Sequence, residues 1–292
     1  FSLAAARLGW PLESTQTFGL HAAPLTRLRP HLSPGLRAIL LLRNGAAVAE
    51  LATYLNETGF ADTQLHVMEA LGGPRERSRS VSLTEALLGG FDHPVCVGLE
   101  VAGEGKALPK ASGKPDDIFE NDGQITKRPV RALTLSALAP KRGEHLWDIG
   151  GGTGSISIEW LMCDPTLTAA TIEPRADRAE RIRRNADALG QDRLSVVHGT
   201  APDALDGLAL PDVVFIGGGL SAALLDWLHA TLPAGTRLVA NAVTLESEAL
   251  LAQWHEKRGG DLLRIELAQA APLGPRRGWK SAYPVVQWNV TL

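Results

Sequence analysis

Three consecutive glycines follow a short apolar stretch that contains one acidic residue. The segment reads Trp147-Asp148-Ile149-Gly150-Gly151-Gly152-Thr153-Gly154-Ser155. Glycine has no Cβ, so this run lets the backbone turn sharply and come close to a ligand. Thr153 or Ser155 can cap the helix predicted next, whose free N–H groups then face that ligand. The residues therefore predict a strand, a ligand-binding turn and a helix, rather than a tight turn with no ligand.

The glycine spacing separates two kinds of cofactor site. A dinucleotide-binding turn needs the pattern G-x-G-x-x-G. Here Gly150, Gly152 and Gly154 give G-x-G-x-G, and Ser155 follows. With the acidic Asp148 shortly before the turn, the segment resembles the first motif of class I S-adenosylmethionine (SAM) methyltransferases. That resemblance implies that Asp148 orients the amino-acid end of SAM and that the glycine backbone packs beneath the cofactor.

Other residues with suitable chemistry stand where predicted strands end. Glu173 ends the second strand, and its carboxylate can accept both ribose hydroxyls of a nucleoside. Thr200 and Ala201 follow the third strand, where a backbone amide can contact an adenine edge. Gly217, Gly218 and Gly219 follow the fourth strand and leave room for a bulky substrate. Because ligands of open α/β sheets bind at the carboxyl ends of the strands, we expect these positions to form one site.

Regular alternation of strand and helix patterns supports this placement. From residue 144 onward the pattern predicts a parallel, doubly wound sheet. Its strands are expected at 145–149, 169–172, 194–198, 213–216, 237–240, 262–268 and 283–290. Residues 1–102 also alternate between helix and strand, and residues 103–116 are rich in glycine and proline. We therefore expect two domains, 1–102 and 117–292, joined by a linker at 103–116.

Bulk composition excludes several classes of partner. The chain has 292 residues, 45% of them hydrophobic, and a net charge of −3, which favours neither nucleic acid nor an anionic membrane. Cys96 and Cys163 are isolated, so no metal site or disulfide is expected and the cytoplasm is the expected location. No signal peptide or membrane span is evident, and a homo-oligomer is expected. The chain starts at Phe1 rather than Met, so we expect an upstream part to be missing.

Five separated motifs resemble a known family, the precorrin-6Y C5,15-methyltransferases (decarboxylating), which are bifunctional enzymes of cobalamin (vitamin B12) biosynthesis. The motifs are 122–127, 130–135, 147–160, 215–219 and 241–246. Residues 1–11 and 69–77 are similar to the second half of the family's tetrapyrrole-methylase domain. The resemblance implies an α/β protein in which a class I SAM-methyltransferase domain, Rossmann-like with a seven-stranded doubly wound sheet, follows half of a tetrapyrrole-methylase α/β domain.

The resemblance also implies a reaction and a set of contacts. The reaction is methylation of precorrin-6Y at carbon 15, with loss of CO2 from the ring C acetate, to give precorrin-8; the full-length enzyme also methylates carbon 5. A reduced tetrapyrrole meso carbon is itself nucleophilic, so methyl transfer depends mostly on positioning. The implied SAM contacts are Thr126, Gly150, Gly151, Gly152, Thr153, Gly154, Glu173 and Ala201, and we add Asp148 and Thr200 from their placement.

The implied substrate carries many carboxylates, so basic side chains should bind it. Candidates are Lys127, Arg128, Arg131, Arg276, Arg277 and Lys280. Asn241 and Glu246 are the candidate catalytic residues near the reacting edge, whereas His198 is interpreted as structural.

Three alternatives stay open at this point. The chain could methylate another small molecule or RNA, bind without turnover, or transfer hydride with NAD. The net charge argues against RNA, the intact motif argues against binding without turnover, and the glycine spacing argues against NAD; another small-molecule substrate stays open.

Overall fold

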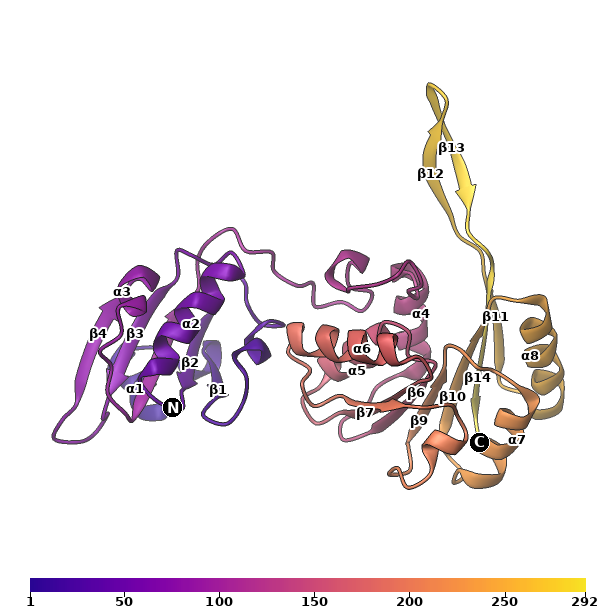
Figure 1. The fold of residues 1–292 in the computed structure, drawn as a ribbon, viewed down its shortest axis with the longest axis horizontal. Helices are drawn as coiled ribbons and strands as arrows, with labels where there is room; N and C mark the ends of the chain where they lie inside the picture. Colours follow the sequence, from indigo (N-terminus) through magenta and orange to yellow (C-terminus); the bar gives the residue numbers. More distant parts are fainter. The chain divides into compact units, whose positions relative to one another are not determined.

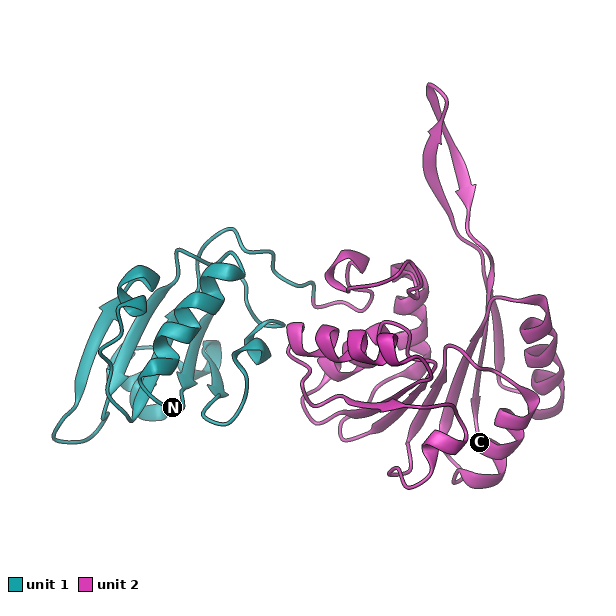
Figure 2. Ribbon diagram, in the orientation of Figure 1, with its two compact units in different colours: residues 1–109 teal, residues 110–292 magenta.

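The computed structural model describes all 292 residues, which form two compact units, 1–109 and 110–292 (Figure 2). The expected linker at 103–116 spans the division between them. None of the helices is both long enough and apolar enough to cross a membrane.

The first unit is a five-stranded sheet with helices on both faces. The strand order is β1 (Gln16–Gly19), β2 (Arg37–Leu41), β5 (Val95–Glu100), β3 (Gln64–Glu69) and β4 (Arg77–Val81). Alternate residues of β2 face opposite sides: Leu40 packs with α2 (Ala46–Glu57), whereas Ile39 packs with α1 (Ser2–Leu8). The short α3 (Leu83–Leu87) begins with a capping box formed by Ser82 and Glu85. Only β1 and β2 pair in parallel; the continuous apolar run at 36–42, which is typical of a parallel strand, therefore has one parallel and one antiparallel neighbour.

The polar, arginine-rich segment 72–79, which the sequence predicts as a turn, is a turn only as far as residue 76, after which β4 begins. Arg77 lies directly opposite Glu69 of β3 and donates two hydrogen bonds, of 2.8 and 2.6 Å, to that carboxylate. Arg79 donates a third, of 3.2 Å. These arginines therefore neutralise the buried carboxylate of Glu69 across a strand pair. The number of charges along the chain does not distinguish such a strand from a solvated loop.

The second unit is the predicted seven-stranded, doubly wound α/β sheet. The order is β11 (Asp261–Ile265), β14 (Val285–Thr291), β10 (Arg237–Ala242), β9 (Val213–Ile216), β6 (His145–Ile149), β7 (Thr168–Glu173) and β8 (Ser195–His198). The sheet is not wholly parallel, because β14 pairs antiparallel with both β10 and β11.

Helices cover both faces of this sheet (Figure 1). Helices α4 (Arg128–Leu138), α5 (Ser155–Cys163) and α6 (Ala176–Ala188) lie on one face. Helices α7 (Ala222–Thr231) and α8 (Leu245–Arg258) pack on the other, where Leu228 and Trp254 meet Ile149, Ile216 and Ala240 of the central strands. The alternating residues of those strands are buried on both sides, as expected for a sheet between two helix layers.

A two-stranded hairpin extends from the second unit between β11 and β14. It consists of β12 (Ala268–Leu273) and β13 (Arg276–Ser281), and Figure 1 shows it projecting away from the seven-stranded sheet. The sequence had predicted one strand running on to residue 268 and a basic loop after it. The side chains of the hairpin are mostly exposed, so hydrophobic periodicity gave no signal for it.

Candidate functional site

A cavity of about 720 Å³ lies at the carboxyl ends of the central strands of the second unit. Six strands contribute to its lining: β6 leads into Gly150–Gly152, β7 ends at Glu173, β9 leads into Gly217–Gly219, β10 carries Asn241, and β11 and β14 contribute Ile265 and Val285. The cavity therefore occupies the place where open α/β sheets bind ligands.

The glycine turn divides into a packed part and an open part. A Cβ on Gly150 would lie 2.5 Å from the backbone nitrogen of Gly218, and one on Gly151 would lie 2.1 Å from Cγ2 of Thr171. A Cβ on Gly152 would meet no atom closer than 4.0 Å, although φ there is +59°. Gly150 and Gly151 are therefore required by packing, whereas the missing side chain of Gly152 leaves the backbone open to the cavity.

Gly154 has a different role from the one predicted for it. It does not line the cavity; it precedes α5 with φ at +75°, and a Cβ on it would lie 2.7 Å from Cγ2 of Ile182. Its prediction as a cofactor contact is therefore corrected to close packing of α5 on α6. The predicted cap by Thr153 or Ser155 is also wrong, because no side chain caps α5.

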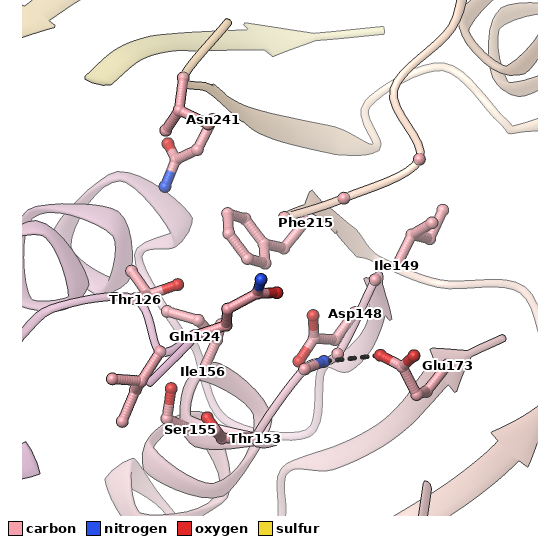
Figure 3. A pocket seen from close by; sticks show the side chains of 18 of the residues that line it. Gln124, Thr126, Asp148, Ile149, Thr153, Ser155, Ile156, Glu173, Phe215 and Asn241 are labelled. Carbon is pink, nitrogen blue, oxygen red and sulfur yellow. Dashed lines mark hydrogen bonds between the residues drawn. The ribbon is translucent and has the colours of Figure 1, made fainter. Parts of the chain in front are cut away.

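The carboxylate of Glu173 is held by the turn beside it. Its Oε2 accepts a hydrogen bond of 2.8 Å from the N–H of Gly152, drawn as a dashed line in Figure 3. Its Oε1 accepts a hydrogen bond of 3.0 Å from the N–H of Arg175. Each oxygen keeps a further lone pair. Glu173 is thus fixed as an acceptor for two neighbouring hydroxyl groups.

Asp148 is a buried carboxylate with one unsatisfied oxygen. Its side chain is 1% exposed, and its Oδ2 accepts a 2.7 Å hydrogen bond from the hydroxyl of Ser157. Its Oδ1 has no partner although it is buried. Burial raises the pKa of Asp148 to about 6, with the Glu173 carboxylate adding to the rise and the Ser157 hydrogen bonds opposing it. At neutral pH the group is therefore ionised, and Oδ1 presents negative charge with no counterpart in the protein.

The side of the cavity formed by Gln124, Ile125, Thr126 and Lys127 is held by a buried ion pair. Arg131 is fully buried; its Nε donates 2.6 Å to Glu159, its Nη2 donates 2.5 Å to the carbonyl of Lys114, and its Nη1 donates to the carbonyl of Thr126. The prediction that Arg131 binds substrate is therefore wrong. Its guanidinium instead fastens the segment before α4 to α5.

Most of the other predicted site residues do come together. Those that line the cavity are Thr126, Lys127, Asp148, Gly150, Gly151, Gly152, Thr153, Glu173, Thr200, Ala201, Gly217, Gly218, Gly219 and Asn241. Arg276, Arg277 and Lys280 lie on β13 of the hairpin and are exposed, and Arg128 and Glu246 lie outside the lining. His198 hydrogen-bonds the carbonyl of Pro174 at 3.0 Å and also stays outside the lining.

Several lining residues were missed, and most of them are apolar. The apolar ones are Ile125, Val130, Ile149, Ile156, Ile172, Pro174, Phe215, Val243, Ile265, Leu267, Ala282 and Val285; the others are Gln124, Ser155, Arg178, Gly199 and Tyr283. Figure 3 shows the Phe215 ring between Asn241 and Asp148. An apolar residue near a strand end is usually interpreted as part of the core, so only the position of Phe215 two residues before the Gly217–Gly219 run could have indicated its role.

Comparison with known proteins gives consistent findings. A family model described as a precorrin methyltransferase domain matches residues 117–292. The precorrin-6Y C(5,15)-methyltransferase (decarboxylating) of Sinorhizobium sp is 51% identical over 294 residues, which covers 99% of this chain and 71% of the relative. A cobalt-precorrin-6B C(15)-methyltransferase (decarboxylating) of Salmonella typhimurium is 35% identical over 178 residues, covering 58% of this chain and 91% of the relative.

A solved structure agrees with these sequence matches. The C-terminal domain of precorrin-6Y C5,15-methyltransferase from Rhodobacter capsulatus superposes with a TM-score of 0.61 at 57% identity. The match covers 63% of this chain and all of that domain. The class I methyltransferase fold expected for the second unit is thereby confirmed.

Proposed function

Because this chain belongs to the precorrin methyltransferase family, we propose that its second unit uses SAM to methylate carbon 15 of precorrin-6Y and removes CO2 from the ring C acetate. Both matched relatives carry methylation and decarboxylation in their names, and one of them names carbon 15 alone. The match to that relative covers 58% of this chain, and the second unit contains the cavity.

The observation that carries the proposal is the unpartnered, ionised oxygen of Asp148 beside an open glycine backbone. SAM is a nucleoside with an ammonium group, a carboxylate and a sulfonium. A buried anionic oxygen without a partner fits the ammonium group, and the two remaining lone pairs of Glu173 fit the ribose hydroxyls. The open face at Gly152 leaves room for the cofactor against the backbone.

SAM supplies an electrophilic methyl group, and the residues of this chain hold the cofactor and the substrate in position. Asp148 and Glu173 hold the polar ends of the cofactor on the β6 and β7 side of the cavity. Phe215, Val243 and Val285 form an apolar surface on the β9, β10 and β14 side, against which a macrocycle can lie. Because the meso carbon is nucleophilic by itself, holding it near the methyl group and excluding water is the main contribution required of the protein.

For the first unit we propose a separate methylation. The 51% identity to the Sinorhizobium relative extends over 99% of this chain and so includes residues 1–102. We assign these residues to the second half of a tetrapyrrole-methylase domain that acts at carbon 5, with 103–116 as linker and 117–292 as the carbon 15 domain.

Mass spectrometry of the corrinoid after incubation with labelled SAM and precorrin-6Y tests the proposal. We expect the second unit to add one methyl group and to remove one CO2, and a second methyl group would mean that the first unit also acts at carbon 5. A product unchanged in mass, in the presence of measured SAM binding, would refute the substrate assignment. Asp148→Asn is the matched control, because it keeps the side-chain size and should weaken SAM binding and slow product formation together.

A further inference from the structure

The wall of the cavity contributed by β10, β11, β14 and their connections is almost free of polar side chains. Its lining residues are Asn241, Val243, Ile265, Leu267, Ala282, Tyr283 and Val285. Asn241 and the 88% exposed Tyr283 are the only polar side chains of this wall. All four charged lining residues, Lys127, Asp148, Glu173 and Arg178, come from other elements. An amide in a mostly apolar wall indicates a specific hydrogen bond with a polar group of the ligand.

The amide of Asn241 is fixed by two buried residues. Gln287 of β14 lies directly opposite Asn241 in the antiparallel pair, and its Nε2 donates 2.9 Å to Oδ1 of Asn241. Nδ2 of Asn241 donates 2.9 Å to the hydroxyl oxygen of Thr134, to which Nε2 of Gln287 also donates at 3.1 Å. Thr134 is fully buried and Gln287 is 4% exposed.

The chemistry of Thr134 decides which way the amides point. Its single hydroxyl hydrogen is donated to the carbonyl of Val130 at 2.9 Å, so its oxygen can only accept from the two amides. Both NH2 groups must therefore face Thr134. This leaves Asn241 with one N–H and one carbonyl lone pair for a ligand, in an orientation that the protein sets in advance.

Resting on the carbon 15 methylation and decarboxylation proposed above, we propose that the free N–H of Asn241 binds the ring C acetate carboxylate that leaves as CO2, and that Thr134 and Gln287 are positioning residues for that amide. In the reaction the bond between the acetate CH2 and its carboxylate breaks. The electron pair of that bond passes into the conjugated ring system, CO2 departs, and a solvent proton later completes the new methyl group.

A neutral donor suits a carboxylate that must lose its charge. An arginine or lysine there would stabilise the carboxylate ion before reaction, and that stabilisation would be lost as CO2 forms, which raises the barrier. An amide N–H orients the carboxylate but binds it more weakly than an arginine or lysine would. The guanidinium of Arg178 is already engaged by Asp122 at 3.1 Å and by Gln124 at 2.6 Å. The apolar surroundings of Asn241 add to the effect, because they favour neutral CO2 over the carboxylate ion.

Rates of CO2 release from precorrin-6Y under saturating SAM test the contact itself. Asn241→Leu removes the hydrogen bond with little change of size, and we expect CO2 release to fall about tenfold or more. The Kd for SAM, measured by calorimetry, should change less than twofold, which also shows that the variant is folded. Asn241→Asp should release CO2 more slowly still, because two carboxylates repel. An Asn241→Asp rate above that of Asn241→Leu would mean that the partner is a ring N–H and would overturn the assignment.

A double-mutant cycle tests the positioning role. Thr134→Val removes the acceptor, and we expect a fall in CO2 release that Thr134→Ser, which keeps the hydroxyl, largely restores. Because Thr134 acts through Asn241, the Asn241→Leu/Thr134→Val double variant should be no slower than Asn241→Leu. Additive losses would overturn the positioning role, and wild-type CO2 release by Asn241→Leu would overturn the contact. If wild-type enzyme binds SAM but leaves precorrin-6Y unchanged, the proposed function itself fails, which is a distinct result.

Discussion

Replacement of Arg131 by methionine should lower the melting temperature of the second unit markedly. The substitution removes the guanidinium that pairs at 2.6 Å with Glu159, which is 1% exposed. Glu159 would keep only the N–H groups of Gly113 and Lys114, at 2.7 and 2.8 Å, as partners. Breaking a buried pair in this way costs about 3–5 kcal/mol, because one charge is left uncompensated.

The size of the effect in a melting experiment follows from the size of the unit. For a domain of 150–250 residues, each kcal/mol shifts Tm by about 2–4 °C, so we expect a decrease of roughly 6–20 °C. The unit comprises residues 110–292 and falls in that range. Scanning calorimetry of the whole chain measures the shift. SAM should also bind more weakly, since the Arg131 contact to the carbonyl of Thr126 holds one side of the cavity.

Two further variants make this prediction refutable. Arg184→Ala removes an exposed ion pair with Glu120 and should leave Tm nearly unchanged, because solvent screens such a pair. Arg131→Met/Glu159→Gln removes both buried charges while keeping an acceptor for the backbone, so it should recover a large part of the loss. If Arg131→Met melted within 2 °C of the wild type while raising KM for the tetrapyrrole, Arg131 would be a substrate contact after all and our structural assignment would be wrong.

Three other results are expected. Since burial raises the pKa of Asp148 to about 6, wild-type affinity for SAM should decline as the pH falls through 6, and the residual affinity of Asp148→Asn should be flat over the same range when both are titrated calorimetrically. Gly152→Ala should lose SAM binding, while its positive φ costs only about 1–2 kcal/mol in the free energy of unfolding. Gly151→Ala should lower Tm more strongly, because its Cβ would lie 2.1 Å from Cγ2 of Thr171. Lys127→Ala should raise KM for the tetrapyrrole, whereas Arg277→Ala should leave it within twofold, because only Lys127 lines the cavity.

The cofactor side of the cavity was predictable because its signals are local. Asp148, the glycines and Glu173 stand at fixed distances from strand ends, and in a doubly wound sheet those ends meet at one edge. Once the alternation of strands and helices is recognised, these residues must converge. The correction at Gly154 has the same local origin: the glycine was recognised, but its neighbour Ile182 is 28 positions away and only the fold shows it.

The basic residues could not be sorted in the same way. Charge alone does not distinguish a substrate ligand from a structural ion pair, so Arg131 was predicted wrongly and the pairing of Arg77 could not be predicted. Each has its acidic partner on a neighbouring element, Glu159 on α5 and Glu69 on β3, and neither pairing has a sequence pattern. The hairpin escaped prediction because its side chains are mostly exposed, which leaves no periodic burial to detect.

The one antiparallel strand inside the sheet has a consequence for the substrate side of the cavity. Asn241 stands next to the carboxyl end of β10, and its registered partner Gln287 stands near the start of β14. Had β14 run parallel to β10, its first residues would lie at the opposite edge of the sheet, far from the cavity. Because β14 runs antiparallel to β10, it begins at the cavity wall with Val285 and places the amide of Gln287 next to the amide of Asn241. Strand direction, rather than any further motif, thus allows a neutral side chain to be held rigidly in an apolar wall, opposite the carboxylates that suit a cationic cofactor.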